Sequence, residues 1–235
     1  MPISTTTDEV APTMRPVLAN EPDEATSARE LGVERGKIFP AEKARTLLNP
    51  LRRLIQSPRR TVNRLGLDPN DRVLELGPGP GYFSVELART VPEGWVVLAD
   101  VQPEMLRIAR GRLTAGRSAS AVSAVSDVSD VSDVYYVAAD ATDLPFSPVT
   151  FDAALVVAML GEVPDQHRCI AELARVVRTG GRVLFAETRR DSDFIRLDAL
   201  RRLVEPHGFD LTDRRGPPWE YTACFERNGE SPGGT

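Results

Sequence analysis

The chain has 235 residues, which is enough for one α/β domain with a modest extension but not for two full domains. Hydrophobic residues make up 41% of it and charged residues 27%, as in an ordinary soluble protein, and the net charge of −5 argues against a general nucleic-acid binder. Its two cysteines lack metal-ligand spacing and no apolar run suits a membrane span or a signal peptide, so we expect a cytoplasmic protein without a metal site or a disulfide framework.

The N-terminal part divides into two segments. Residues 1–30 are rich in Thr, Pro, Ala, Glu and Asp without periodicity, which predicts a disordered tail. Residues 31–65 carry leucines at helical spacing among arginines, and Pro50 and Pro58 divide them into short helices. Packing of the leucines on the main domain is the favoured interpretation, and peripheral contact with an anionic membrane is the alternative. The main domain then occupies residues 66–235.

A strand predicted over residues 72–76 runs into a turn with three alternating glycines, Gly77, Gly79 and Gly81, and then into a helix. Glycines allow backbone conformations closed to other residues and let a ligand lie against the main chain. The unpaired N–H groups at the helix start favour a carboxylate or phosphate there. Glu75, inside the strand, is costly to bury unless it meets a cation or donors, and an amino group on the ligand would meet that need.

Two further predicted strands lead into aspartates. The strand over residues 95–100 ends at Asp100, which can accept hydrogen bonds from both hydroxyls of a ribose. A helix beginning at Pro103 follows. The next strand, over residues 134–138, leads to Asp140, and a carboxylate at this place can accept the exocyclic N–H of adenine.

Residues 121–134 carry a motif, AVS or DVS, that repeats every three residues, and nearly all of them fall in a segment, 118–133, that separates two predicted elements. This period fits neither a strand nor an α-helix, so we expect a flexible surface insertion. The remaining elements are expected in the order strand, helix, strand after a Gly-Gly turn, helix and β-hairpin, over residues 151–157, 165–177, 182–187, 197–203, and 209–215 with 221–227.

In combination, Glu75 with its glycines, Asp100, the segment from Asp140 to Phe146 and the strand after Gly180-Gly181 resemble the class I S-adenosylmethionine (SAM)-dependent methyltransferases. The likeness is broadly to the type that includes quinone-biosynthesis C-methyltransferases. It implies a Rossmann-like α/β three-layer sandwich whose seven-stranded sheet is mostly parallel with an antiparallel last strand. It also implies SAM as cofactor, S-adenosylhomocysteine (SAH) as product and methyl transfer by in-line displacement.

The resemblance assigns cofactor binding to a set of residues at the ends of the first three strands: Glu75, Gly77, Gly79, Gly81, Asp100, Val101, Gln102, Asp140 and Ala141. It further implies that the N-terminal helices of residues 31–65 form a lid. The loop after the fourth strand resembles the pattern L-H-E-V-x-D, with Gly161 where a histidine often stands, which removes one possible base.

Methyl transfer requires alignment more than a catalytic triad, so no catalytic residue is assigned. The candidates for a base are few. They are Glu162 and His167, both weak, and His207, Glu187 and Tyr82.

A small, lipophilic methyl acceptor is the expected partner, because the N-terminal segment is rich in leucine and nucleic-acid motifs are absent. Two alternatives remain at this point. One is an NAD(P)-dependent oxidoreductase that shares the glycine turn and Asp100, and the other is a non-catalytic SAM-binding protein. The sequence carries no signal for an oligomeric state.

Overall fold

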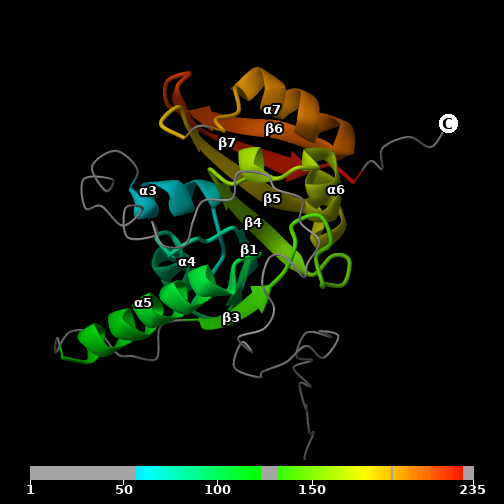
Figure 1. Cartoon of the computed structure of the whole chain (residues 1–235). Coiled ribbons are helices and arrows are strands. Elements are labelled where there is room, and N and C mark those ends of the chain that lie inside the picture. Colours follow the sequence, from blue (N-terminus) through cyan, green and yellow to red (C-terminus); the bar gives the residue numbers. More distant parts are fainter. Residues whose placement is uncertain (1–56, 123–131, 192, 230–235) are drawn as a thin grey trace, which may run out of the picture.

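Seven strands form a single sheet in the computed structural model, which describes residues 57–122, 132–191 and 193–229. The strands are β1 (Arg72–Leu76), β2 (Trp95–Asp100), β3 (Asp133–Ala138), β4 (Phe151–Val157), β5 (Val177–Thr188), β6 (Phe209–Arg215) and β7 (Glu220–Arg227). Their order across the sheet is β3-β2-β1-β4-β5-β7-β6 (Figure 1). Only β7 runs antiparallel to its neighbours, as the sequence predicts. This separates the sheet from the dinucleotide-binding fold with six parallel strands.

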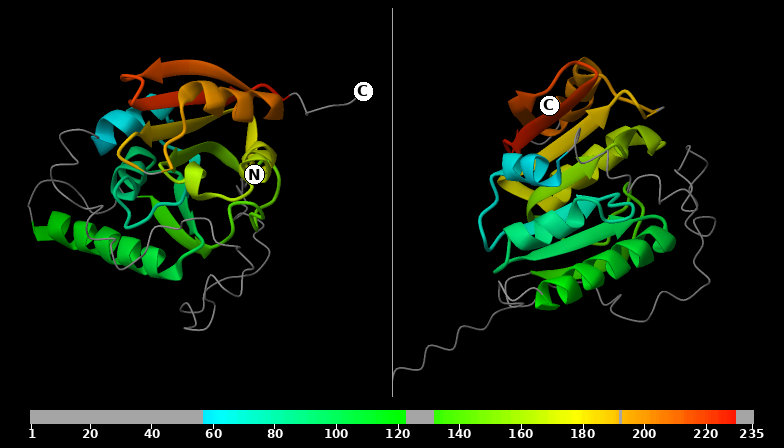
Figure 2. Two further views of the ribbon diagram at one scale, coloured as in Figure 1. Left: turned by 45° about the horizontal axis from the view of Figure 1, so that its top comes forward. Right: turned by 90° about the vertical axis from the view of Figure 1, so that its left-hand side faces the viewer.

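Helices cover both faces of this sheet. They are α3 (Pro58–Val62), α4 (Ser84–Thr90), α5 (Pro103–Val122), α6 (Gln166–Val176) and α7 (Leu197–Val204), with short 3₁₀ turns η2 (Asn63–Leu65), η3 (Leu160–Glu162) and η4 (Glu205–His207). The first three helices lie on one face, and α6 and α7 lie on the other (Figures 1 and 2). The three-layer sandwich is therefore confirmed.

Alternate residues of each central strand enter two separate cores. In β1, Leu74 packs in the core beneath α6 and α7, whereas Val73 packs in the core beneath α4 and α5. This alternation explains why the central strands read as continuous apolar runs, because both of their faces are buried. Glu75 falls on the α4 side by the same alternation, and it is the one carboxyl among these core positions of β1.

The Gly-Gly segment is the main departure from the predicted elements. Strand β5 begins at Val177, directly after α6, and Phe151 pairs with Val177 while Ala153 pairs with Arg182. The intervening residues therefore bulge out of the β4–β5 ladder. Gly181 permits this because a Cβ there would lie 2.7 Å from the Asp152 carbonyl oxygen.

Several sequence predictions lie outside the described residues. These are the tail over residues 1–30, the expected lid up to residue 56 and the centre of the repeat insertion, residues 123–131. In the described part of the chain, no helix is both long and apolar enough to cross a bilayer.

The connectivity reverses direction between β1 and β4. From β1 the chain crosses first to β2 and β3 on one side, and then returns to β4 on the other side of β1. Connections leave the carboxyl ends of these two neighbouring strands in opposite directions, and ligands of open α/β sheets bind in the crevice that results.

At the opposite end of β4, Asp152 joins three segments. Its carboxylate accepts hydrogen bonds from Arg72 Nε at 2.8 Å, Arg72 N at 2.9 Å and Arg178 Nε at 2.7 Å. Partial burial acts to raise the pKa of Asp152, but the hydrogen bonds from the two arginines outweigh it and lower that pKa. Asp152 therefore stabilises the fold in its ionised form.

We expect Asp152→Asn to lower the free energy of unfolding at pH 7 by about 1–2 kcal/mol, because two charge-assisted contacts are lost. The difference from wild type should be complete above about pH 4 and vanish as the pH falls through the lowered pKa. Urea unfolding at a series of pH values measures it. The matched control is Asp198→Asn, since Asp198 also contacts two arginines, Arg196 and Arg202, but on the exposed surface. Equal losses for both variants would contradict the argument.

Candidate functional site

A pocket opens at the carboxyl ends of β1, β2 and β4, at the point where the connectivity reverses. Eight of the nine predicted cofactor residues line it: Glu75, Gly77, Gly79, Asp100, Val101, Gln102, Asp140 and Ala141. Apolar side chains, among them Phe83 and Met159, complete the wall. The sequence therefore anticipates most of the lining that β1, β2 and β3 supply.

The turn after β1 needs glycine for two separate reasons. Gly77 and Gly79 have φ of 67° and 52°, in the left-handed region that other residues rarely adopt. In addition, a Cβ at Gly77 would lie 2.4 Å from Met159 Cγ. The loop after β4 can therefore pack onto the turn, and at Gly77 and Gly79 no Cβ stands between the main chain and the pocket.

The third glycine, Gly81, does not line the pocket. Its φ is 74°, and a Cβ there would lie 3.0 Å from Ala109 Cβ and 3.1 Å from Ala109 Cα in α5. Gly81 thus allows α5 to pack closely against the start of α4, a role that the motif alone does not reveal.

Glu75 is the most deeply buried acid of the pocket, with 2% of its surface exposed. Ser84, the first residue of α4, donates a hydrogen bond from Oγ to Glu75 Oε2 at 2.5 Å. Burial raises the pKa of Glu75 to about 8, and the Ser84 hydrogen bond opposes this rise only in part. A cation entering the pocket would therefore restore the charged form of the carboxyl group.

Asp100 is held in one orientation by backbone donors. Its Oδ1 accepts from Gln102 N at 2.9 Å, and its Oδ2 accepts from Gly79 N at 3.4 Å. Burial raises the pKa of Asp100 to about 6 despite these two hydrogen bonds. The carboxyl group is thereby fixed beside the glycine turn, where it suits a pair of hydroxyl groups.

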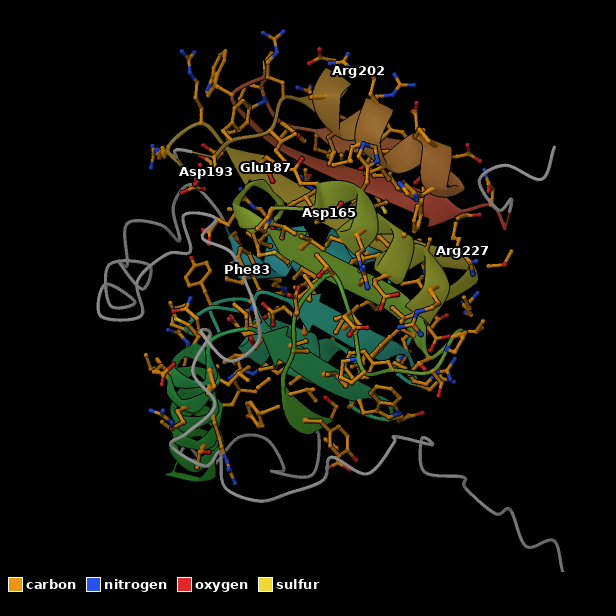
Figure 3. The ribbon with its side chains drawn as sticks, turned by 45° about the vertical axis from the view of Figure 1, so that its right-hand side comes forward. Phe83, Asp165, Glu187, Asp193, Arg202 and Arg227 are labelled. Atoms are coloured by element: carbon orange, nitrogen blue, oxygen red, sulfur yellow. The ribbon has the colours of Figure 1, made fainter. Side chains whose placement is uncertain are left out.

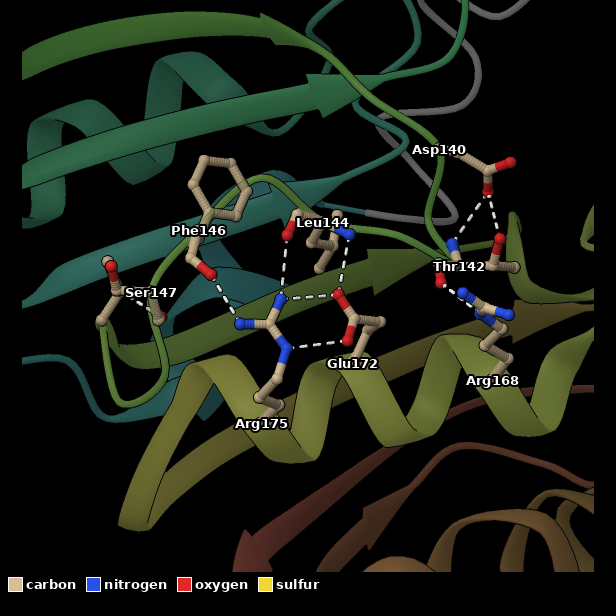
Figure 4. Close-up of polar contacts among 9 residues, drawn as sticks. Asp140, Thr142, Leu144, Phe146, Ser147, Arg168, Glu172 and Arg175 are labelled. Carbon is tan, nitrogen blue, oxygen red and sulfur yellow. Dashed lines mark hydrogen bonds and ion pairs between the residues drawn. The ribbon is translucent and has the colours of Figure 1, made fainter. Parts of the chain in front are cut away.

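Asp140 closes a turn at the third strand (Figure 4). Its Oδ1 accepts from both the backbone N–H and the hydroxyl of Thr142, each at 2.8 Å. The other carboxyl oxygen, Oδ2, takes no part in these two hydrogen bonds. This local turn explains why the segment after β3 reverses and exposes Asp140 to the pocket.

Side chains of helix α6 form hydrogen bonds to the backbone of the segment that follows Asp140. Arg168 Nε donates to Thr142 O at 2.8 Å, and Arg175 donates to Leu144 O at 2.8 Å and to Phe146 O at 2.6 Å (Figure 4). In the other direction, Leu144 N donates to Glu172 Oε2 at 2.7 Å. The three α6 side chains stand four and three residues apart, so they share one face of the helix.

The Glu172–Arg175 ion pair supplies most of these hydrogen bonds to the Asp140 loop. Partial burial acts to raise the pKa of Glu172, but hydrogen bonds from Arg175 and Leu144 N outweigh it and lower that pKa. The sequence shows charges at helical spacing here, yet their partners are backbone groups of the Asp140 loop. Backbone partners carry no side-chain signature, which is why sequence reasoning missed this contact.

The two weak candidates for a base lie in different places. Glu162, in η3, lines the pocket. His167 does not line it and is exposed on α6, where its Nδ1 lies 3.2 Å from Nε2 of His207. His207 is likewise outside the pocket lining, and burial lowers its pKa with His167 adding to the effect. The pair therefore links α6 to η4 on the surface.

Gly161 lies in the loop after β4, where it packs directly against the loop after β5. A Cβ at this position would lie 2.0 Å from the carbonyl oxygen of Asp193 and 2.8 Å from Asp193 Cβ. A histidine, or any residue with a side chain, would force these loops apart. Glycine at this position thus has a packing reason of its own.

The cysteines and the other residue types that can bind a metal ion form neither a disulfide nor a metal site in the described part of the chain. Cys169 and Cys224 are buried thiols without a disulfide partner in the resolved core. Among the described segments, no group of three or more His, Cys, Asp or Glu residues is arranged to hold a metal ion.

Comparison with known proteins agrees with this geometry. A family model described as a methyltransferase domain matches residues 74–185, which include the glycine turn and the Asp140 loop. The chain is also 31% identical over 157 residues to the ubiquinone/menaquinone biosynthesis C-methyltransferase UbiE of Vibrio campbellii. That match covers 66% of this chain and 54% of the relative, so the chain spans about half the length of the curated relatives it matches.

Solved structures share the fold at low sequence identity. A SAM-dependent methyltransferase from Aquifex aeolicus superposes with a TM-score of 0.69 at 17% identity, covering 80% of this chain and 99% of that one. The [4+2]-cyclase SpnF superposes with a TM-score of 0.54 at 24% identity, covering 67% of this chain and 57% of that one. The same fold therefore occurs in a protein named for a different reaction.

We expect Glu75→Gln to stabilise the ligand-free protein increasingly as the pH rises from about 5 to 8. In this range the unfolded chain releases the Glu75 proton while the native protein retains it, so the wild type loses stability with rising pH and the variant is spared that loss. The gain should reach about 1 kcal/mol or more at pH 8. Thermal unfolding at several pH values measures it, with exposed Glu226→Gln as control. A gain that does not change with pH would refute the buried-acid argument.

Gly161→Ala should destabilise the protein by about 1–3 kcal/mol, because the added methyl group collides with the Asp193 backbone. The matched control is Gly111→Ala in α5, where a Cβ meets nothing within 4 Å. An exposed helical glycine replaced by alanine should instead gain up to about 1 kcal/mol. Chemical denaturation of both variants makes the comparison, and a tolerated Gly161→Ala would disprove the tight loop contact.

Proposed function

We infer that this chain, which belongs to the class I SAM-dependent methyltransferases, transfers the methyl group of SAM to a small molecule. The observation that carries the proposal is the pocket in which two buried carboxyl groups, Glu75 and Asp100, flank the glycine-containing turn after β1. An oxidoreductase using NAD(P) would have no evident need for Glu75, and its fold has a different sheet.

The pocket residues fit the parts of SAM one by one. Gly77 and Gly79 let the carboxylate lie against the main chain of the turn that leads into α4, and Glu75 suits the amino group. Asp100 suits the ribose hydroxyls, and Asp140 with the Ala141 N–H suits the adenine. When bound, SAM supplies an electrophilic methyl group on a sulfonium centre. The protein contributes orientation and a dry pocket, which are worth roughly 7–11 kcal/mol in well-aligned reactions.

The proposed acceptor is a quinol-like aromatic molecule that is methylated at carbon. The name of the Vibrio relative supports this class, and so do the apolar side chains Tyr82, Phe83 and Met159 of the pocket wall. We further propose that residues 31–65 form a lid over this side of the pocket. The described end of that segment is anchored to the main domain, because Val62 and Leu65 are buried in the core next to α4 and Arg64 hydrogen-bonds Thr222 of β7.

A non-catalytic SAM-binding protein is the second candidate. The observation in its favour is that neither histidine of the chain lines the pocket, so no imidazole base is available there. It differs from the enzyme in one measurable respect, since it would bind SAM but transfer no methyl group to quinols, phenols or amines.

Calorimetric titration with SAM, SAH and NADH tests the cofactor. We expect SAM and SAH to bind and NADH not to bind. Asp100→Ala should weaken SAM binding by about 10- to 100-fold, because hydrogen bonds to a charged group are lost. Asp143→Ala, in the exposed part of the Asp140 loop, is the control and should leave binding unchanged. Binding of NADH alone would overturn the proposal, and SAM binding without transfer to any acceptor would favour the second candidate.

A further inference from the structure

An exposed tryptophan marks the turn between β6 and β7. Trp219 has 59% of its surface exposed. The turn is stiff, because Pro217 and Pro218 fix two φ angles and Glu220 N donates to Pro217 O at 3.1 Å. Gly216 begins it with φ of 93°, and a Cβ there would lie 2.3 Å from Glu220 O. Trp219 is therefore presented from a rigid turn, which lowers the entropy cost of binding through it.

This turn lies at the same end of the sheet as the pocket. Thr188, the last residue of β5, pairs with Glu220, so the turn extends past the carboxyl end of β5 (Figures 1 and 2). Arg189 N donates to Trp219 O at 2.7 Å. This hydrogen bond joins the turn to the loop after β5.

The loop after β5 connects the turn to the pocket. Arg189, its first residue, contacts the turn, whereas Asp191 lines the pocket and the backbone of Asp193 packs against Gly161. Figure 3 shows Asp193 at the same edge of the sheet as Glu187, near the end of β5. A partner bound at the turn would therefore meet the protein beside the pocket.

Four exposed arginines stand on the two segments that this hydrogen bond joins. Arg214 and Arg215 end β6 just before the turn, and Arg189 and Arg190 directly follow β5. They approach the turn from two different strands, so Trp219 lies between two pairs of cationic side chains in the chain path.

Helix α3 adds cations from a distant part of the sequence. Arg64, which follows α3, hydrogen-bonds Thr222 of β7, the residue paired with Arg215. Burial lowers the pKa of Arg64, and the charges of Arg215 and Arg60 add to this lowering. The arginines of α3 and of the hairpin are therefore close enough to repel one another.

Positive charge dominates these segments although the whole chain has a net charge of −5. Over residues 57–66, 188–190 and 213–221 the acids are Asp213 and Glu220, both half-buried, and Asp213 forms an ion pair with Arg215 at 3.0 Å. The arginine–tryptophan surface, as we name it, consists of Arg59, Arg60, Arg189, Arg190, Arg214, Arg215 and Trp219, which are all exposed. Like charges held together repel, so an anionic partner would relieve this repulsion.

The residue types of this surface indicate the class of the partner. Tryptophan combines an apolar ring with an N–H donor and favours the boundary between membrane and water, and arginine is attracted to anionic head groups there. A single-stranded nucleic acid would need several aromatic rings to stack successive bases. Trp219 is the one large aromatic residue that is exposed in the part of the chain that the structure describes, which favours a lipid surface.

We propose that the arginine–tryptophan surface docks on an anionic membrane, with Trp219 at the level of the head groups and the exposed arginines attracted to the lipid phosphates. This contact goes beyond methyl transfer and does not require it. Under the proposed function, it would place the pocket beside the membrane from which a lipophilic acceptor is drawn.

Co-sedimentation of the full chain with vesicles tests the docking. One set of vesicles is phosphatidylcholine alone, and the other contains about 30% phosphatidylglycerol. We expect binding to the anionic vesicles to be about tenfold tighter or more, and to weaken as NaCl rises from about 0.05 to 0.5 M, because salt screens the arginines. Trp219→Ser, and Arg189→Glu combined with Arg190→Glu, should each weaken this binding by about tenfold or more.

Matched controls lie elsewhere on the described surface. Val149→Ser removes another exposed apolar side chain, and Arg107→Glu combined with Arg110→Glu makes the same change of net charge on exposed positions of α5. Both should keep wild-type binding. Fluorescence gives a second measurement, since the emission of Trp219 should shift to shorter wavelength with anionic vesicles. Trp95, the only other tryptophan in the sequence, packs against the core and should not respond.

Every outcome decides the proposal. Binding that depends on phosphatidylglycerol, on Trp219 and on the two arginines supports it. Absence of vesicle binding overturns it, and so does binding that both variants retain, because the contact would then belong to another surface such as residues 31–65. Tighter binding to a single-stranded oligonucleotide than to the anionic vesicles would make a nucleic acid the partner and would also overturn it. Vesicle binding is measured without SAM, so this inference and the proposed function fail separately.

Discussion

Three carboxyl groups, Glu75, Asp100 and Glu187, are buried at the same edge of the sheet, and burial raises the pKa of each. Carboxyl groups are usually excluded from such positions because desolvation costs more than an isolated hydrogen bond returns. Each of them accepts some of the hydrogen bonds that a carboxyl group can accept: from Ser84 for Glu75, from two backbone N–H groups for Asp100, and from Ile195 N for Glu187. Glu75 and Asp100 also line the pocket, so the hydrogen bonds that they do not make within the protein are available to a ligand there.

Close backbone approach is the second requirement of the site, and it connects elements that are distant in sequence. The absence of a Cβ lets Gly77 pack closely against Met159, Gly81 against Ala109, and Gly161 against the backbone of Asp193. Helix α6 adds a polar counterpart through Arg168, Glu172 and Arg175, which hold the loop carrying Asp140. The loops at the pocket are therefore fixed by contacts to the scaffold, which gives side chains on loops the precision that orientation-based catalysis needs.

The fold by itself does not decide the reaction, since a cyclase and a methyltransferase both superpose on this chain. What distinguishes the reactions is the end of the pocket beyond the cofactor. There the chain offers apolar walls, the carboxyl groups of Glu162 and Asp191, and, among the residues that line the pocket, no histidine. Under the proposed function, such a surface would receive an apolar ring that carries hydroxyl groups and would act by positioning it, without an imidazole base.

The sequence alone determined the succession of strands along the chain, the glycine turn, and the aspartates at the end of β2 and after β3, because these follow from local patterns of apolar residues, glycine and acid within a few positions. It also indicated the antiparallel hairpin at the C-terminal end through Gly216-Pro217-Pro218. Only the tertiary structure decided that Gly81 packs against α5 and that His167 pairs with His207 away from the pocket. It also decided that Glu187 is buried with one oxygen that has no partner among the described residues. These depend on contacts between residues far apart in the chain, and no local pattern encodes which backbone or side chain will be met across the sheet.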